Sequence, residues 1–337
     1  MKTIFVTGGA GFIGSAFVRL ALEKGARVVN YDALTYAGNL ANLDGIDSTL
    51  HTFVKGDICD RDAVLAAMPD ECDAVFNLAA ESHVDRSIHS ADEFLRTNIL
   101  GTQVLLDVAR AKKVRRFVQI STDEVMGSLP DASDDYFTEA SPLQPNSPYA
   151  ASKASAEFVV RAARETHGVD YVITRCGNNY GPRQFPEKLI PLMIANATND
   201  EPLPVYGDGM NVRDWIYVDD HCEAIWLAYE LGRAGEVYNI GARNERYNLD
   251  VVKAILDAVG KPHSLIKYVT DRLGHDRRYA INPTKAETEL GWKPATTWEA
   301  GLTKTLGWYS TNGDWVDRVR SGAYQDYYRS VYPELSH

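Results

Sequence analysis

Short apolar runs that end in glycine, asparagine or aspartate alternate along this chain with amphipathic stretches of helical periodicity. Continuous apolar strands separated by helices are what a parallel sheet covered on both faces requires. We therefore expect an α/β fold built on a doubly wound parallel sheet. The clearest strand candidates are Thr3–Thr7, Val28–Tyr31, Ala74–Leu78, Phe117–Ser121 and Tyr171–Thr174.

The character of the chain changes at a turn-rich stretch, Cys176–Pro182, which contains asparagines, glycines and a proline. This change predicts a nucleotide-binding domain over residues 1–177. A smaller C-terminal substrate-binding region is expected over residues 178–337, interleaved with the first domain, and its aromatic segment Trp308–Tyr332 is expected to pack as an arm or cap. Within this region we expect helices at Leu189–Ala197, His221–Leu231 and Leu249–Val259, and strands at Val205–Tyr206 and Val237–Ile240.

Composition limits the possible partners. With 337 residues, 45% of them hydrophobic, the chain can bury a substantial core. A formal net charge of −11 disfavours binding to nucleic acid or to an anionic membrane, because their phosphates attract basic surfaces. A phosphorylated ligand must therefore meet a local group of cations. The sequence shows no signal-peptide core and no membrane span, so we expect a cytoplasmic location.

The cysteines predict neither a disulfide framework nor a metal site. They lie far apart in the sequence and lack the spacing of metal ligands. We therefore expect no metal ion and interpret these residues as buried or incidental thiols. They are Cys59, Cys72, Cys176 and Cys222.

A glycine-rich turn follows the first predicted strand and leads into a helix. Gly8, Gly11 and Gly14 provide the spacing that lets the backbone approach a pyrophosphate at a helix N-terminus, and Phe12 and Ile13 lie within the same turn. This context predicts a Rossmann-like dinucleotide site.

Asp32 ends the second strand, where a carboxylate accepts hydrogen bonds from the ribose hydroxyls of a dinucleotide. A carboxylate repels a 2′-phosphate, and Ala33, Leu34 and Thr35 offer no cation to neutralise one, so NAD is favoured over NADP. The remaining predicted cofactor contacts are Thr35, Asp57, Ile58, Ala79, Ala80, Thr97, Tyr149, Lys153 and Asn178.

Tyr149 and Lys153 lie one helical turn apart after Pro148, a residue that favours a helix start. We expect the lysine ammonium and a positive nicotinamide to lower the pKa of the tyrosine, so that Tyr149 takes a proton from an alcohol. The strand Phe117–Ser121 runs into Thr122-Asp123-Glu124. Because ligands bind beyond the carboxyl ends of parallel strands, all five side chains should face one cleft.

Longer motifs make the resemblance specific. The chain resembles the extended branch of the short-chain dehydrogenase/reductase family, and within it the dTDP-glucose 4,6-dehydratases, over nearly its whole length. Beyond the glycine turn and the Tyr149/Lys153 pair, the motifs are Asp32–Asn39, Ala79–Ser87, Asn178–Pro182, Pro186–Pro191, Asn211–Trp215 and Asp271–Tyr279.

The resemblance implies an NAD-dependent dehydration of dTDP-glucose to its 4-keto-6-deoxy product. Tyr149 would deprotonate the 4-hydroxyl while hydride leaves C4, with Thr122 hydrogen-bonding the same oxygen. Glu124 would then remove the C5 proton, and Asp123, as a neutral acid, would protonate the departing C6 hydroxyl. Hydride would finally return to C6. Adjacent carboxylates suit this chemistry, because different burial separates their pKa values.

For the substrate, the resemblance implies a set of contacts that includes two arginines. Arg213 and Arg272 suit a pyrophosphate, since guanidinium groups match phosphate oxygens bidentately, and they supply the local positive charge that an acidic protein needs. The other predicted substrate contacts are Ser82, Thr122, Asn179, Lys188, Leu189, Tyr206, Asn248 and His275.

The motifs leave alternatives open. A nucleotide-sugar 4-epimerase shares the C4 oxidation but needs no acid/base pair such as Asp123-Glu124. A 5,6-dehydratase, or a dehydratase of GDP-mannose or CDP-glucose, is also compatible with the motifs, and so is a noncatalytic NAD-binding regulator. Met126 departs from the family, which usually has tyrosine there, and we expect it to pack in the interior. The resemblance also suggests a homodimer formed through helices near Glu93–Ala111 and Tyr149–Glu165.

Overall fold

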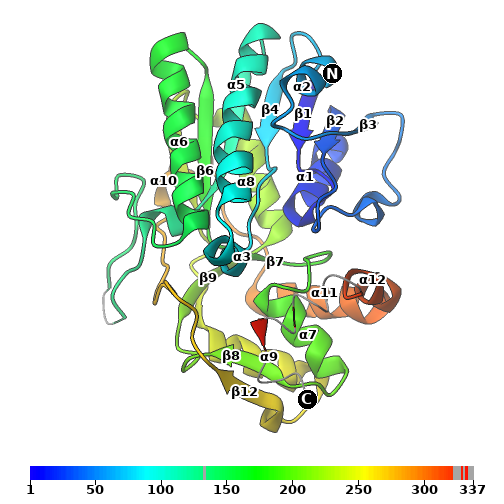
Figure 1. The fold of residues 1–337 in the computed structure, drawn as a ribbon, viewed down its shortest axis with the longest axis vertical. Coiled ribbons are helices and arrows are strands. Elements are labelled where there is room, and N and C mark those ends of the chain that lie inside the picture. Colours follow the sequence, from blue (N-terminus) through cyan, green and yellow to red (C-terminus); the bar gives the residue numbers. More distant parts are fainter. Residues whose placement is uncertain (132–133, 322–327, 329–330, 333–337) are drawn as a thin grey trace.

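The computed structural model describes residues 1–131, 134–321, 328 and 331–332. In this part of the chain two lobes lie one above the other, with the N-terminus on the larger, upper lobe (Figure 1). No helix among these residues is long and apolar enough to cross a membrane.

The upper lobe is built on a parallel sheet. Its strand order is β10-β6-β5-β4-β1-β2-β3, and every neighbouring pair is parallel. The order reverses between β1 and β4, which is where an open α/β sheet leaves a crevice for a ligand. The strands are β1 (Thr3–Thr7), β2 (Arg27–Asp32), β3 (His51–Lys55), β4 (Ala74–Asn77), β5 (Arg116–Thr122), β6 (Tyr171–Cys176) and β10 (Glu236–Ile240).

Helices cover both faces of this sheet (Figure 1). One face packs against α1 (Phe12–Glu23) and α8 (Val218–Leu231), with Phe17, Phe76 and Trp226 in the same buried cluster. The other face packs against α2 (Arg61–Ala67), α5 (Thr102–Ala111) and α6 (Pro148–His167). The predicted Rossmann-like doubly wound fold is confirmed.

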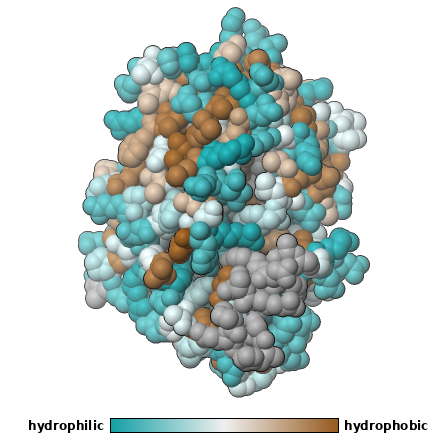
Figure 2. Space-filling view, in the orientation of Figure 1, coloured by the Kyte–Doolittle hydropathy of each residue, from teal (hydrophilic) through white to brown (hydrophobic). Residues whose placement is uncertain are grey.

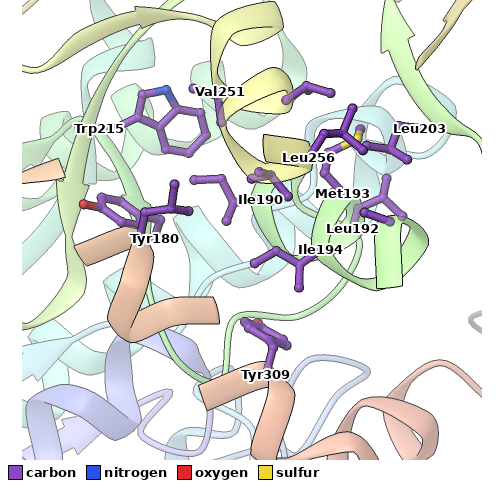
Figure 3. Packing of buried hydrophobic residues seen from close by; sticks show 14 of the residues in the cluster. Tyr180, Ile190, Leu192, Met193, Ile194, Leu203, Trp215, Val251, Leu256 and Tyr309 are labelled. Carbon is purple, nitrogen blue, oxygen red and sulfur yellow. The ribbon is translucent and has the colours of Figure 1, made fainter. Parts of the chain in front are cut away.

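The lower lobe has its own apolar core. Side chains of α7, such as Ile190 and Met193, interleave with Val251 and Leu256 of α9 beside Trp215 (Figure 3). The helices are α7 (Leu189–Thr198), α9 (Asn248–Val259), α11 (Trp298–Thr311) and α12 (Gly313–Val319), and the strands are β7 (Asn178–Tyr180), β8 (Leu203–Tyr206), β9 (Val212–Tyr217), β11 (Glu245–Tyr247) and β12 (Ile266–Val269). Tyr309 and Trp315, within the predicted aromatic arm, join this core.

Short elements complete the described chain, and Asp85 in the first turn of one of them, α3, contacts the lower lobe. They are α3 (Val84–His89), α4 (Asp92–Phe94), a π-helical stretch (Leu95–Gly101), α10 (Thr284–Glu289) and 3-10 turns at Leu40–Leu43, Asp123–Met126 and His263–Leu265.

The chain passes between the lobes more than once. After β9 in the lower lobe, α8 returns to pack on α1, and β10 pairs in parallel with β6 at the edge of the upper sheet. The predicted strand Val237–Ile240 therefore extends the upper sheet, because its apolar residues become buried only beside β6. Its sequence position, far beyond residue 177, gave no sign of this placement.

A buried carboxylate joins three elements of the upper lobe. Glu157 on α6 accepts a hydrogen bond from the Ser121 hydroxyl of β5 at 2.6 Å and from the Arg175 guanidinium of β6 at 2.7 Å. Only 5% of each charged side chain is exposed. This ion pair fixes how α6 lies against the carboxyl ends of β5 and β6.

Replacing Glu157 with leucine should destabilise the fold strongly, because it leaves the Arg175 charge buried and unpaired. We expect a loss of about 3–5 kcal/mol in the free energy of unfolding, measured by urea denaturation, with much of it regained in Glu157→Leu/Arg175→Met. Asp200→Asn, which removes the exposed pair with Lys261, should cost less than about 1 kcal/mol. Equal losses for the two single variants would contradict this role of the pair.

Candidate functional site

A cavity of about 480 Å³ lies between the lobes at the carboxyl ends of the upper strands. Every residue that the sequence predicted for the catalytic, cofactor and substrate sites lines it. They come from both lobes, so the fold brings together residues that are as far apart in the chain as Gly8 and His275.

The glycine turn forms the floor of the cofactor half. Gly8 has a φ of 70°, and a side chain there would approach the backbone of Ala79, two residues beyond β4, to 2.7 Å. A side chain on Gly14 would overlap the Gly8 carbonyl oxygen. The absence of side chains keeps the N-terminus of α1 open to a pyrophosphate, so these residues fit a dinucleotide.

Asp32 ends β2 at the edge of the same cavity. Its carboxylate accepts hydrogen bonds from the backbone N–H groups of Ala10 and Leu34 at 2.9 and 2.8 Å. Burial raises its pKa, while the two backbone donors act in the opposite direction. These bonds hold the carboxylate beside the glycine turn, where ribose hydroxyls can donate to its remaining lone pairs.

The three residues after β5 form a tight turn. The Thr122 hydroxyl accepts from the backbone N–H of Glu124 at 3.3 Å, which caps a 3-10 helix and turns both carboxyl groups toward the cavity. Asp123 is only 2% exposed, and one of its carboxyl oxygens has no hydrogen-bond partner among the described residues. Its other oxygen accepts a hydrogen bond from the Thr122 hydroxyl at 3.3 Å. Burial of a carboxyl with one oxygen unpaired favours its neutral form.

Electrostatics distinguish the two adjacent acids. Burial, followed by the nearby Glu124 charge, raises the pKa of Asp123 well above its usual value. Burial also raises the pKa of Glu124, but Arg272, Arg213 and Lys188 oppose that rise. Burial and the Glu124 charge therefore favour the neutral form of Asp123, while the nearby cations favour the ionised form of Glu124.

Tyr149 and Lys153 lie in the first turns of α6, which Ser147 caps through its side chain. The Lys153 ammonium donates to the Ile120 carbonyl at 2.6 Å, and burial lowers its pKa to about 8. Burial and then Glu124 raise the pKa of Tyr149 well above its usual value. In the protein alone, burial thus penalises the phenolate, and the lowering expected with a positive nicotinamide beside Tyr149 stays a prediction.

The lower lobe contributes the cations of the substrate half. Arg213 of β9 is buried and stacks over Tyr279 at 4.2 Å, and its guanidinium donates to the Asp276 carbonyl at 2.8 Å. Lys188 donates to the Ser82 carbonyl at 2.7 Å across the cleft. These contacts hold positive charge in the cavity of an acidic protein.

Some cavity residues were not predicted as site residues. Glu187 is buried and accepts from the Tyr36 hydroxyl at 2.9 Å, and burial raises its pKa to about 7. Asp85 and Tyr279 also line the cavity. All of them lie in motifs noted in the sequence, but only the folded chain shows which of their side chains reach the cavity.

Met126 packs in the interior as expected. It is 2% exposed, belongs to a cluster with Phe137 and Ile281, and does not line the cavity. Its sulfur lies 3.7 Å from the Arg175 guanidinium.

The described residues contain no group of three or more acidic, histidine or cysteine side chains that could hold a metal ion.

A glycine turn, a strand-end carboxylate and a Tyr/Lys pair around one cleft define an extended short-chain dehydrogenase/reductase. A family model described as GDP-mannose 4,6 dehydratase matches residues 5–305. The chain is 51% identical to a dTDP-glucose 4,6-dehydratase of Xanthomonas campestris, over 96% of this chain and 98% of the relative. It belongs to the dTDP-glucose 4,6-dehydratase family.

Solved structures agree with this assignment. The dTDP-glucose 4,6-dehydratase DesIV of Streptomyces venezuelae, crystallised with NAD, has a TM-score of 0.91 and 48% identity, over 94% of this chain and 99% of that chain. A UDP-glucose 4-epimerase of Thermus thermophilus has a TM-score of 0.85 but only 29% identity, over 92% of this chain and 99% of that chain. The fold is thus shared with epimerases, while sequence identity favours the dehydratases.

Asp123→Asn should raise the melting temperature by a few degrees at a pH of about 7. The carboxyl has a higher pKa in the folded chain than in the unfolded chain, so its ionisation opposes folding once the pH exceeds the unfolded value near 3.9. The difference should vanish at a pH of about 3, measured by differential scanning calorimetry. Asp70→Asn, at an exposed site, should change little. A lower melting temperature for Asp123→Asn at neutral pH would contradict the raised pKa.

Proposed function

We propose that this enzyme converts dTDP-glucose into dTDP-4-keto-6-deoxyglucose and water, with NAD as its cofactor. The observation that carries the proposal is the Asp123-Glu124 pair, which faces the same cavity as Tyr149 and Lys153. A 4-epimerase needs a pair such as Tyr149 and Lys153 for the oxidation at C4, but it needs no acid/base pair such as Asp123-Glu124. Relatives whose sequences are about half identical to this chain are named dTDP-glucose 4,6-dehydratase, and one related structure was crystallised with NAD.

Each proposed role follows from the local environment. Tyr149, whose phenolate form Lys153 and the positive charge of bound NAD would favour, accepts the proton of the sugar 4-hydroxyl, with Thr122 hydrogen-bonding the same oxygen. When bound, NAD supplies a hydride acceptor for C4 and later a hydride donor for C6. Asp32, whose carboxylate is fixed by backbone donors, favours NAD over NADP, and Lys153 supplies positive charge near Tyr149.

The carboxyl groups then eliminate water. Glu124, which nearby cations favour in its ionised form, removes the C5 proton made acidic by the 4-ketone. Asp123, neutral through burial, protonates the C6 hydroxyl as the C–O bond breaks. Proton transfers of this kind contribute about 10²–10⁴-fold each. Glu124 finally returns a proton to C5. The proton that Tyr149 accepted from the 4-hydroxyl must then pass to Asp123, directly or through solvent, before the protein is back in its starting state.

The substrate's nucleotide half binds the lower lobe in this proposal. Arg213 and Arg272 pair with the diphosphate, since both line the cavity as cations. The other proposed contacts are Ser82, Asn179, Lys188, Leu189, Tyr206, Asn248 and His275.

In this proposal residues 1–177 form the NAD-binding domain and residues 178–337 mainly the nucleotide-sugar region. Two elements of the second range, α8 and β10, pack with the first domain. We also propose a cytoplasmic location, because the four cysteines are free thiols and the cytosol keeps thiols reduced.

The decisive experiment uses dTDP-glucose deuterated at C4, incubated with the purified enzyme without added reductant. We expect the deuterium at C6 of a 4-keto-6-deoxy product, detected by mass spectrometry and NMR, because the hydride removed from C4 is returned within the same active site. Deuterium retained at C4 of dTDP-galactose would instead establish an epimerase. Absence of any reaction would overturn dTDP-glucose as the substrate.

Two variants serve as controls for the roles of the acids. Glu124→Gln and Asp123→Asn should keep bound NAD and bind dTDP-glucose, yet form product at least about 100-fold more slowly, because each removes one proton transfer. Wild-type turnover in either variant would remove the role assigned to that residue.

We also propose a homodimer that packs through α5 and α6. Apolar side chains gather on the surface over these helices (Figure 2). Exposed large apolar side chains in this part of the chain are Phe158 of α6, which is 58% exposed, and Leu95 and Leu100 of the π-helical stretch before α5, which are 45% and 52% exposed. Apolar residues gathered on one face mark a protein interface more often than singly scattered ones do.

Phe158→Glu should convert the dimer to a monomer, because it places a charge in the apolar interface. Size-exclusion chromatography with light scattering measures the mass. Leu231→Glu, at a similarly exposed site at the end of α8, should leave the dimer intact. A monomeric wild-type enzyme, or a dimer that survives Phe158→Glu, would exclude this interface.

A further inference from the structure

Asp85 connects the upper lobe to the predicted substrate contacts of the lower lobe. It lies in the first turn of α3, on the cavity wall. One carboxylate oxygen accepts from the Tyr206 hydroxyl at 3.0 Å, and the other accepts from the Arg272 guanidinium at 3.3 Å. A single carboxylate therefore holds one side chain of β8 and one of the segment that follows β12.

The guanidinium of Arg272 has more than one edge available for hydrogen bonds. Its Nη1 faces Asp85, while its Nε is buried and has no hydrogen-bond partner among the described residues. The side chain lines the cavity. A buried donor without a partner is costly, and an incoming oxyanion would satisfy it.

The ion pair is itself well shielded from solvent. The side chains of Arg272 and Asp85 are only 19% and 13% exposed, so the interaction is screened less than a surface pair. The same stretch of chain receives a second contact from the lower lobe, because Lys188 donates to the Ser82 carbonyl. The stretch from Ser82 to Asp85 thus bonds to three predicted substrate-binding side chains, those of Lys188, Tyr206 and Arg272.

We propose that Asp85 is a positioning residue for the nucleotide sugar. It orders the Tyr206 hydroxyl and the Arg272 guanidinium before the ligand binds, so that the free edge of Arg272 meets the diphosphate. This inference rests on the proposed function. Ordering long side chains in advance lowers the entropy cost of binding.

An opposite effect is the alternative that the experiment must exclude. A carboxylate near a diphosphate also repels it, so a residue that only repels would weaken binding, and its removal would tighten binding. The positioning role predicts the reverse sign, because the charge of Asp85 is paired with Arg272 and its loss frees two side chains.

The test measures dTDP affinity by calorimetry and steady-state kinetics with dTDP-glucose for Asp85→Ala and Asp85→Asn. We expect Asp85→Ala to raise both Kd and KM about tenfold, with kcat within about twofold of wild type and bound NAD unchanged. Asp85→Asn should show about a threefold rise, because its amide oxygen still accepts one hydrogen bond. Asp131→Asn, which removes an exposed pair with Arg277 on the same segment as Arg272, is the matched control and should change nothing.

A double-mutant cycle with Tyr206→Phe separates positioning from a general loss of structure. If Asp85 acts through Tyr206, then adding Asp85→Ala to Tyr206→Phe should raise Kd by less than about threefold. Full additivity would exclude action through Tyr206 and leave only the contact with Arg272. Tighter binding by Asp85→Asn, or unchanged Kd in Asp85→Ala, would overturn the inference while wild-type turnover leaves the proposed function standing. Absence of dTDP binding or turnover in the wild type would overturn the proposed function itself.

Discussion

The ion pair between Glu157 and Arg175 is the constraint on which the geometry of the cleft depends. The Glu157 carboxylate also accepts from Ser121, so one side chain joins α6 to the carboxyl ends of β5 and β6. Tyr149 and Lys153 precede Glu157 on the same helix, and Thr122 directly follows Ser121 on the strand. The position of the tyrosine relative to the two acids is therefore set by a buried network of charged and polar groups, which is rigid only because every partner is present.

Burial then determines the chemistry of these groups. Desolvation alone would raise the pKa values of Asp123, Glu124 and Tyr149, and it lowers that of Lys153. The lower lobe modifies this effect, because Arg272, Arg213 and Lys188 oppose the rise in the pKa of Glu124, whereas Arg213 opposes it for Asp123. The lower lobe, packed against the sheet, thus lines the substrate site and also acts differently on the pKa values of the two adjacent acids. Binding and acid/base chemistry therefore depend on the same contacts.

The comparison with epimerases shows how little of the fold is specific to one reaction. A 4-epimerase with 29% identity shares this architecture at a TM-score of 0.85. The scaffold supplies a dinucleotide crevice and a Tyr/Lys pair, and different chemistry requires only different side chains at the carboxyl ends of the strands. In this chain those side chains include Asp123 and Glu124, to which we assign the elimination of water.

The sequence by itself determined β1, β2, β4, β5 and β6 of the upper sheet and the residues around its crevice. Continuous apolar strands and the Gly8–Gly14 turn are local signals, since period and glycine spacing do not depend on distant contacts. The motifs also placed Thr122–Glu124 and Tyr149 beside one cleft. Only the tertiary structure decided that β10 joins the upper sheet, that Asp85 holds Tyr206 and Arg272, and that the pKa of Tyr149 rises. Each of these depends on pairing or desolvation between residues distant in the chain, and no local pattern encodes such contacts.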